Sequence, residues 1–241
     1  MGPTQLCSDH YIIFLLYSDR YVICQENGYM PDVKTKNAGV SGEKPKGRPR
    51  SFDRDRALLR ALDIFWRKGF EPASVAELCA AMEINPPSLY SAFGNKAKLF
   101  LEAVSYYEKV YWKATWERLE EEPDITQAID KFFSEAADIL LSPSAPCGCM
   151  VVLAAINVSQ ESSDVVEAVS VLRQEGKDLF EKRLRRAVRE QQLPTDTATA
   201  ALATVLNTLL EGMSIEAKDG ATPASLRATG QYASRLLPCQ K

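Results

Sequence analysis

The residues from Pro87 to Lys96 carry apolar, hydroxyl and basic side chains in a spacing that suits contact with a nucleic acid. Pro87, Ser88, Tyr90 and Ser91 fall on one side of a helical pattern, and Lys96 follows at the start of the next helix. Serine hydroxyls hydrogen-bond to base edges, proline offers only apolar contact, and tyrosine and lysine reach phosphates. We predict that Pro87, Ser88 and Ser91 read bases weakly, and that Tyr90 and Lys96 anchor phosphates of double-stranded DNA.

The pattern around these side chains predicts a short helix. Asn85 can accept from first-turn amides as an N-cap, and Pro86 falls at the first helical position, where a missing N–H costs nothing. Leu89 and Phe93 are four residues apart and share the inward face. The outward residues then lie near the N-terminus of the helix, the part of a recognition helix that meets base edges.

A second helix directly precedes this one. Residues 74–82 have apolar side chains at helical spacing, with Ser74 as the N-cap and Glu77 completing a capping box. Ser74 is a third candidate for phosphate contact. Only Glu83 and Ile84 separate the two helices, and so tight a connection predicts a helix-turn-helix.

A third amphipathic helix is predicted over residues 53–68. It ends at Gly69, where a left-handed residue is favoured. Residues 44–100 carry 11 Lys and Arg against 6 Asp and Glu, whereas residues 101–241 carry 15 against 21. A basic head on an acidic body is typical of a DNA-binding protein with a separate second domain.

These motifs resemble the tetracycline-repressor (TetR) family of bacterial regulators over residues 47 to about 105. The resemblance implies an all-α fold, with a helix-turn-helix head and a helical ligand-binding and dimerisation domain, and a DNA-binding regulator, usually a repressor. Glu83 replaces a glycine that is frequent in the family's turn, and Ala92 replaces an aromatic residue or histidine. The resemblance rests on Gly47-Arg48-Pro49-Arg50, Ala61-Leu62-Asp63-Ile64-Phe65, Lys68-Gly69-Phe70, Ser74-Val75, Leu89-Tyr90, Phe93 and Lys96.

Three regions are therefore expected along the chain. Residues 1–46 read as a disordered or extraneous extension, residues 47–100 as the DNA-binding domain, and residues 101–241 as the ligand-binding and dimerisation domain. Within the extension, residues 1–29 contain an apolar run too short to span a membrane, and a genuine extra strand or a membrane-surface tether remains an alternative. His10, the only histidine, is assigned no role.

Basic residues just before the first helix form a candidate DNA-binding arm. Lys46, Arg48 and Arg50 alternate with Gly47 and Pro49, which suit an extended chain. We predict minor-groove contacts from Arg48 and Arg50. The alternative is a solvated run of charge.

The body reads as a series of helices over residues 96–121, 124–141, 147–158, 163–192, 194–216 and 222–237. The fifth is rich in alanine and threonine, whose small side chains let two helices approach closely. We expect the last two helices of each subunit to form a homodimer interface, with intramolecular packing as the alternative. The basic residues near the end of residues 163–192 are expected on a solvated face.

Aromatic residues of the body could line a pocket for a small, mostly apolar effector of unknown identity. Aromatic residues at helical spacing also occur as plain core, and that alternative stays open. The candidates are Tyr106, Trp112, Trp116, Phe132, Phe133, Met150 and Phe180.

Catalytic and metal-binding constellations are not expected in this sequence. One histidine cannot complete a hydrolytic triad without the N-terminal extension, no zinc spacing is present, and no cofactor is predicted. Cys147 and Cys149 form the single candidate redox site, since thiols at a helix N-terminus can be reactive. Cysteine spacing and the lack of an export signal predict a cytoplasmic protein without a membrane span. A redox sensor, or a helical binding module or enzyme that does not bind DNA, remains the alternative function.

Overall fold

Helices make up all the regular structure in residues 52–239, the part of the chain that this computed structural model describes. The predicted arm residues Arg48 and Arg50, and the whole 1–46 extension, lie outside it. The elements, in chain order, are α2 (Arg54–Lys68), α3 (Val75–Met82), α4 (Pro86–Phe93), α5 (Lys96–Tyr107), the π-helix η1 (Glu108–Trp112), α6 (Lys113–Glu121), α7 (Ile125–Leu140), α8 (Met150–Leu153), the 3₁₀ turn η2 (Gln160–Ser162), α9 (Ser163–Arg189), α10 (Thr199–Lys218), α11 (Pro223–Gly230) and the 3₁₀ turn η3 (Ser234–Leu236).

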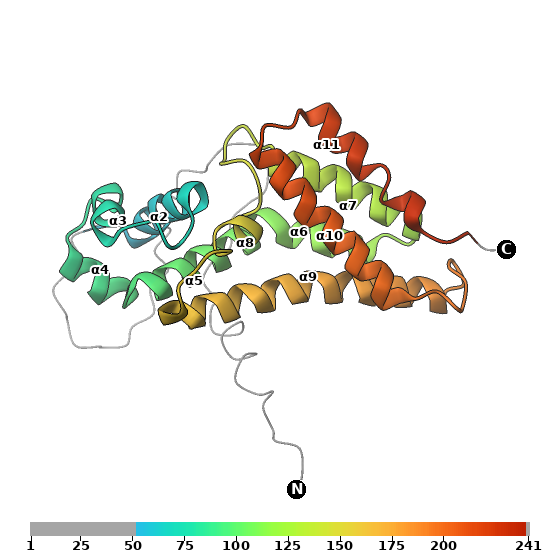
Figure 1. The fold of residues 1–241 in the computed structure, drawn as a ribbon, viewed down its shortest axis with the longest axis horizontal. Coiled ribbons are helices and arrows are strands. Elements are labelled where there is room, and N and C mark those ends of the chain that lie inside the picture. Colours follow the sequence, from blue (N-terminus) through green and yellow to red (C-terminus); the bar gives the residue numbers. More distant parts are fainter. Residues whose placement is uncertain (1–51, 240–241) are drawn as a thin grey trace, which may run out of the picture. The chain divides into compact units, whose positions relative to one another are not determined.

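Helices α2, α3 and α4 gather at one end of the described unit, and α5 leads from them into the body (Figure 1). We call residues 52–100 the head. Ser74 and Asn85 accept first-turn amides as side-chain N-caps, as the sequence predicts, and Asp53 does the same at the start of α2. Gly69 ends α2 with φ +86°, which confirms the predicted left-handed residue.

A continuous helical rod joins the head to the far end of the body. It consists of α5, η1 and α6, where the sequence predicts one uninterrupted helix over residues 96–121. The π-helical turn of Glu108–Trp112 is the difference, and such turns insert a residue into the helical register and recur at functional sites. Hydrophobic periodicity tolerates such an insertion, so the sequence did not reveal it.

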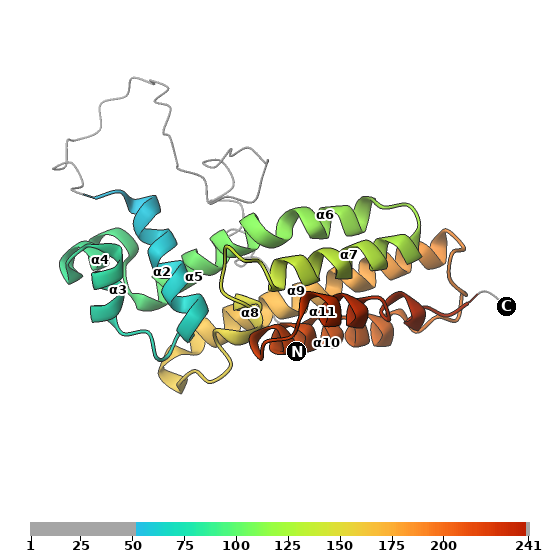
Figure 2. The ribbon, with the colours of Figure 1, turned by 90° about the horizontal axis from the view of Figure 1, so that it is seen from above.

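The body packs its helices around a core that is continuous with the head (Figure 2). Helix α9 runs alongside the rod, α10 packs on α9, and α7 lies between α6 and α11. No helix in the described residues is long and apolar enough to cross a membrane.

Two predicted helices are shorter than expected. Only Met150–Leu153 of the predicted 147–158 helix is helical, because the chain turns after Leu153 and the Ala154 carbonyl accepts from Phe70 N at 2.7 Å. The last helix ends at Gly230, and a short 3₁₀ turn follows before Pro238.

The basic end of α9 contains one residue that the sequence interpretation misplaced. Arg183 was expected on a solvated face but is fully buried. Its Nε donates to Leu119 O at 3.1 Å, and its Nη2 donates to Glu122 O at 2.8 Å and Pro123 O at 3.1 Å. Arginine thus satisfies the carbonyl groups that the end of α6 leaves without helical partners.

Candidate nucleic-acid interface

Helix α4 presents a polar, solvent-exposed face opposite its buried one. Leu89 and Phe93 pack inward, as predicted. Pro87 and Ser91 are exposed, Ser88 is partly exposed, and Tyr90 is 50% exposed, unusually open for a tyrosine in a packed three-helix head. The residues predicted to read bases and to bind a phosphate therefore share one accessible surface.

The turn between α3 and α4 is built on a residue with positive φ. Glu83 has φ +58°, a left-handed conformation that glycine adopts at lower cost. The Arg60 guanidinium pairs with the Glu83 carboxylate at 2.7 Å and donates to Ala81 O at 3.1 Å. These contacts hold the turn that sets α4 against α3.

Ser74 marks the N-terminus of α3 on the exposed surface. Its Oγ accepts from Glu77 N at 3.1 Å, which leaves the hydroxyl proton free to donate to a phosphate. The Glu77 carboxylate binds Lys68 Nζ at 2.5 Å, so the carboxylate's principal partner is a lysine of α2.

Lys96 points back into the head in this DNA-free structure. Its Nζ donates to Glu71 O at 3.1 Å and lies 4.4 Å from the centroid of the Phe70 ring. Burial lowers the pKa of Lys96. Its predicted phosphate contact stays a prediction.

A second basic residue, Arg54 of α2, packs against the C-terminal part of α4. Arg54 binds the Glu102 carboxylate through both terminal nitrogens, at 2.5 and 2.7 Å, and its guanidinium lies 4.4 Å from the Phe93 ring centroid. A bidentate arginine pair fixes orientation as well as distance. Helices α2, α4 and α5 therefore hold a defined geometry before DNA arrives.

Three hydrogen bonds connect the head to the segment around α8 and on to α10; we call this set the joint. Trp66 Nε1 donates to Gly148 O at 2.8 Å, and Phe70 N donates to Ala154 O. Cys149 N donates to Ser214 Oγ of α10 at 2.7 Å. A Cβ at Gly148, which has φ +84°, would come within 2.9 Å of Ser214 O, so the close approach requires glycine.

Behind the joint lies a carboxyl group that forms no ion pair with any described residue. Glu108, on the π-helix, is half-buried, and its burial and the carboxylate of Glu175 raise its pKa to about 8. Burial, with Glu108 nearby, also raises the pKa of Cys149 to about 12. The sequence interpretation missed Glu108, because its burial depends on packing between distant segments and leaves no local pattern in the sequence.

The predicted pocket residues mostly form a ring-on-ring cluster. Trp116 lies 4.4 Å from Phe132 and 5.1 Å from Phe180 between ring centroids, and Phe133 stacks on Phe180 at 5.9 Å. Trp112 and Met150 are also buried. Tyr106 instead lies toward α2, where burial and the Asp55 carboxylate raise its pKa. A ligand entering this cluster would have to displace rings.

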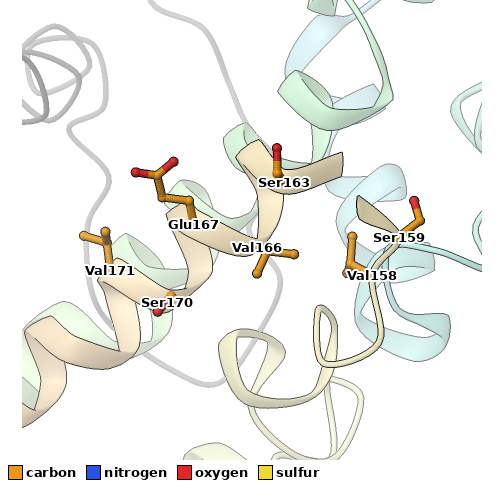
Figure 3. A pocket seen from close by; sticks show the side chains of 7 residues that line it. All are labelled: Val158, Ser159, Ser163, Val166, Glu167, Ser170 and Val171. Carbon is orange, nitrogen blue, oxygen red and sulfur yellow. The ribbon is translucent and has the colours of Figure 1, made fainter. Parts of the chain in front are cut away.

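An open groove of about 560 Å³ lies where the chain enters α9 (Figure 3). Val158 and Ser159 come from the preceding loop, and the remaining side chains come from the first turns of α9. The groove shares no residue with the predicted pocket. It is lined by Val158, Ser159, Ser163, Val166, Glu167, Ser170 and Val171.

Helix α10 exposes small and apolar side chains. Val205 is 48% exposed and Ile215 is 47% exposed, and Thr204 and Thr208 of the same helix are also exposed. A Cβ added at Gly212 would meet nothing within 4 Å. This face is free to receive a second helix.

The remaining candidate chemistry is sparse. Cys147 is exposed and Cys149 is buried. Among the described residues, no group of three or more His, Cys, Asp or Glu side chains could hold a metal ion.

Two family models match the chain. The model of the tetR family of bacterial regulatory proteins matches residues 58–103, and that of the tetracyclin repressor-like C-terminal domain matches residues 126–231. The chain is 29% identical to the HTH-type transcriptional repressor ComR of Escherichia coli K12, over 81% of this chain and 94% of ComR. It is 32% identical to the uncharacterized HTH-type transcriptional regulator YezE of Bacillus subtilis 168, over 67% of this chain and 84% of YezE.

A solved structure with DNA is also similar. It contains a cysteine variant of the TetR family transcriptional regulator CifR, complexed with a 26-base-pair double-strand operator DNA. That chain is 42% identical and superposes with a TM-score of 0.76, covering 79% of this chain and 100% of its own.

Proposed function

This chain belongs to the tetR family of bacterial regulatory proteins, and we propose that it is a repressor that dissociates from its operator DNA when it binds a small ligand. The observation that carries the proposal is the exposed face of α4, held by capped helices and a buried opposite side. Such a helix fits the major groove with its N-terminal residues against base edges.

The DNA-facing surface comprises Ser74, Pro87, Ser88, Tyr90, Ser91 and the basic start of α5, which contains Lys96 and Lys98. An arm with Arg48 and Arg50, outside the described residues, extends this surface. Serine and proline provide little direct base readout, so phosphate contacts and DNA shape contribute much of the affinity. We expect a pseudo-palindromic operator whose half-sites are about 34–36 Å apart.

Dimerisation places two heads on one operator. We assign the interface to α10 and α11, because α10 presents an outward face of small side chains. Gly212→Leu tests this assignment, since the monomer has room for the added side chain. Sedimentation should show a shift toward monomer with unchanged helicity, and an unchanged dimer would remove α10 from the interface.

The joint offers a route from ligand to DNA. Segment 147–155 contacts the head through Trp66 and Phe70, and contacts α10 through Ser214. A ligand that favours one arrangement of this segment shifts the spacing of the two heads, and DNA must change ligand affinity by the same factor. We expect the ligand-favoured spacing to be the one that does not fit the operator.

The protein acts by binding in the cytoplasm, without catalysis or a cofactor. Burial that raises the pKa of Cys149 keeps its thiol protonated, which disfavours the redox alternative.

Fluorescence anisotropy with DNA from both flanks of the protein's own gene tests the proposal. We expect salt-dependent binding to one flanking fragment that competitor DNA of mixed sequence does not displace, and loss of that selectivity in Tyr90→Ala. Equal affinity for all fragments, in the wild type and in the variant, would refute sequence-specific regulation by α4.

A further inference from the structure

The basic residues of the described part of the head differ in whether their charge is already matched. Most of them pair within the protein: Arg54 with Glu102, Arg60 with Glu83, Arg67 with Asp63, and Lys68 with Glu77. Lys96 donates to a backbone carbonyl. Arg56 and Lys98 are exposed and, within the described residues, have no such side-chain partner. A cation without an internal partner keeps its full charge for an incoming polyanion.

Lys98 lies against the end of the recognition helix. A Cβ built at Gly94 would fall 2.9 Å from the Lys98 Cδ, so the lysine stem crosses the space that glycine leaves open. Gly94 is exposed and follows Tyr90 by four residues, at the C-cap of α4. The exposed side chain of Lys98 therefore lies beside the C-terminal end of α4, the helix that contains Tyr90.

Lys96 extends in a different direction from the same turn of α5. Its ammonium lies over the Phe70 ring and on Glu71 O, in the loop that leads from α2 to Ser74. The hydrogen bond to Glu71 O uses one N–H of the Lys96 ammonium and holds the loop that precedes Ser74, the N-cap of α3.

We propose that Lys98 supplies the phosphate contact at the start of α5, and that Lys96 is a positioning residue for the α2–α3 loop. The inference rests on the proposed function, because it assigns contacts within the DNA-binding surface. It reverses the simplest expectation from the sequence, in which Lys96 is the phosphate anchor. Glycine at position 94 is then needed both for its φ of +85° and for the path of the Lys98 stem.

The salt dependence of binding separates the two lysines. A duplex of mixed sequence suffices as the probe, since phosphate neutralisation governs non-specific binding too. Two subunits lose two contacts in Lys98→Ala, so the slope of log affinity against log salt should fall by about 1.8. Affinity at 0.1 M salt should fall roughly tenfold to a hundredfold, Lys98→Arg should restore both values, and thermal stability should not change.

Lys96→Met should behave differently. We expect its affinity to fall by the same factor at every salt concentration, with an unchanged slope. Hydrogen exchange of the amides in residues 70–74 should accelerate, and Lys96→Arg should restore both protection and affinity. The matched control is Lys113→Ala, an exposed lysine about 22 Å further along the helical rod, which should leave the slope unchanged.

The outcomes distinguish the two proposals. Wild-type protein that binds no DNA would overturn both the proposed function and this assignment. Salt-dependent wild-type binding with an unchanged slope in Lys98→Ala would overturn the assignment alone. A lowered slope in Lys96→Met without faster exchange in residues 70–74 would show that Lys96 is the phosphate contact.

Discussion

The two ends of the helical body are held together in contrasting ways. At the far end, where α6 turns into α7, many polar contacts lie close together. Arg183 donates to three backbone carbonyls, and the Gln192 amide accepts from Ile125 N and donates to Pro123 O. Two ion pairs, Arg118 with Glu135 and Lys131 with Glu122, add to these hydrogen bonds. At the joint, Trp66 and Phe70 of the head donate to segment 147–155, and the segment donates to α10 through Cys149 N. Arg173 of α9 also donates to Val151 O and Ala155 O of this segment. The far end contains ion pairs as well as hydrogen bonds, whereas segment 147–155 has no charged side chain and is held through hydrogen bonds to its backbone.

This difference indicates where the protein can change shape. Elements that move in regulation come from regions of low local stability, and a segment without ion pairs of its own, close to a carboxyl group with a raised pKa, is a candidate for such an element. The far end then serves as a fixed reference against which segment 147–155 and the head move. Substitutions at the far end should change stability, and substitutions at the joint should change the relation between ligand and DNA.

Replacing Arg183 should give the largest effect. Arg183→Ala removes the side-chain donor from the buried Leu119 carbonyl and from the partly buried Glu122 carbonyl, and it opens a cavity, so the free energy of unfolding should fall by about 3 kcal/mol. Urea unfolding at fixed protein concentration measures it, since dimerisation makes stability concentration-dependent.

The neighbouring Lys182 provides the matched control for that experiment. Its side chain is 64% exposed and lies 3.3 Å from Glu120, so Lys182→Ala should cost no more than about 0.5 kcal/mol. Equal losses in the two variants would show that the far end is no more rigid than an ordinary surface.

The sequence predicts the head better than the body for a physical reason. Caps and turn residues act within four positions of the chain, so Ser74 and Asn85 mark their helices correctly. Contacts between distant segments leave no local pattern: the buried charge of Arg183 depends on carbonyls that are 60 to 64 positions away.

The same reason explains the errors around α8 and the basic start of α5. Apolar content over residues 147–158 predicted a longer helix, but the carbonyl of Ala154 is bound by the head. The sequence places Lys96 and Lys98 together on one basic turn. Only the structure shows that the Lys96 ammonium donates to Glu71 O and lies over the Phe70 ring.

The pH dependence of stability should reveal the unpaired carboxyl at the joint. Folding raises the pKa of Glu108 from 4.5 to about 8, so the folded state binds more protons than the unfolded state between these values. Stability should therefore fall as the pH rises from 4.5 to 8, by about 1 kcal/mol per pH unit at most after screening by solvent. Glu108→Gln should flatten that slope in urea titrations between pH 5 and 9.

An exposed carboxyl of α9 serves as the comparison for Glu108. Glu167 is exposed to solvent, so Glu167→Gln should keep the wild-type slope. Glu175 lies near Glu108 and has its own pKa raised by burial, so it adds to the slope in the same direction. A wild-type slope that Glu108→Gln does not alter would place the responsible group elsewhere.

A small change in stability, and the sharpest test of the joint, should come from Trp66→Phe. Phenylalanine keeps an aromatic ring beside Tyr107 and Tyr111 but removes the donor to Gly148 O, so the loss should be about 1 kcal/mol. If the joint transmits the ligand signal, this variant should bind operator nearly as the wild type does, yet respond less to the ligand. Arg118→Ala at the far end, which loses a partly exposed ion pair, provides a variant of similar small cost for comparison. If the ligand lowers operator affinity less than in the wild type, and equally so in both variants, then any loss of stability weakens the coupling between ligand and DNA. The joint would then have no specific role in this coupling.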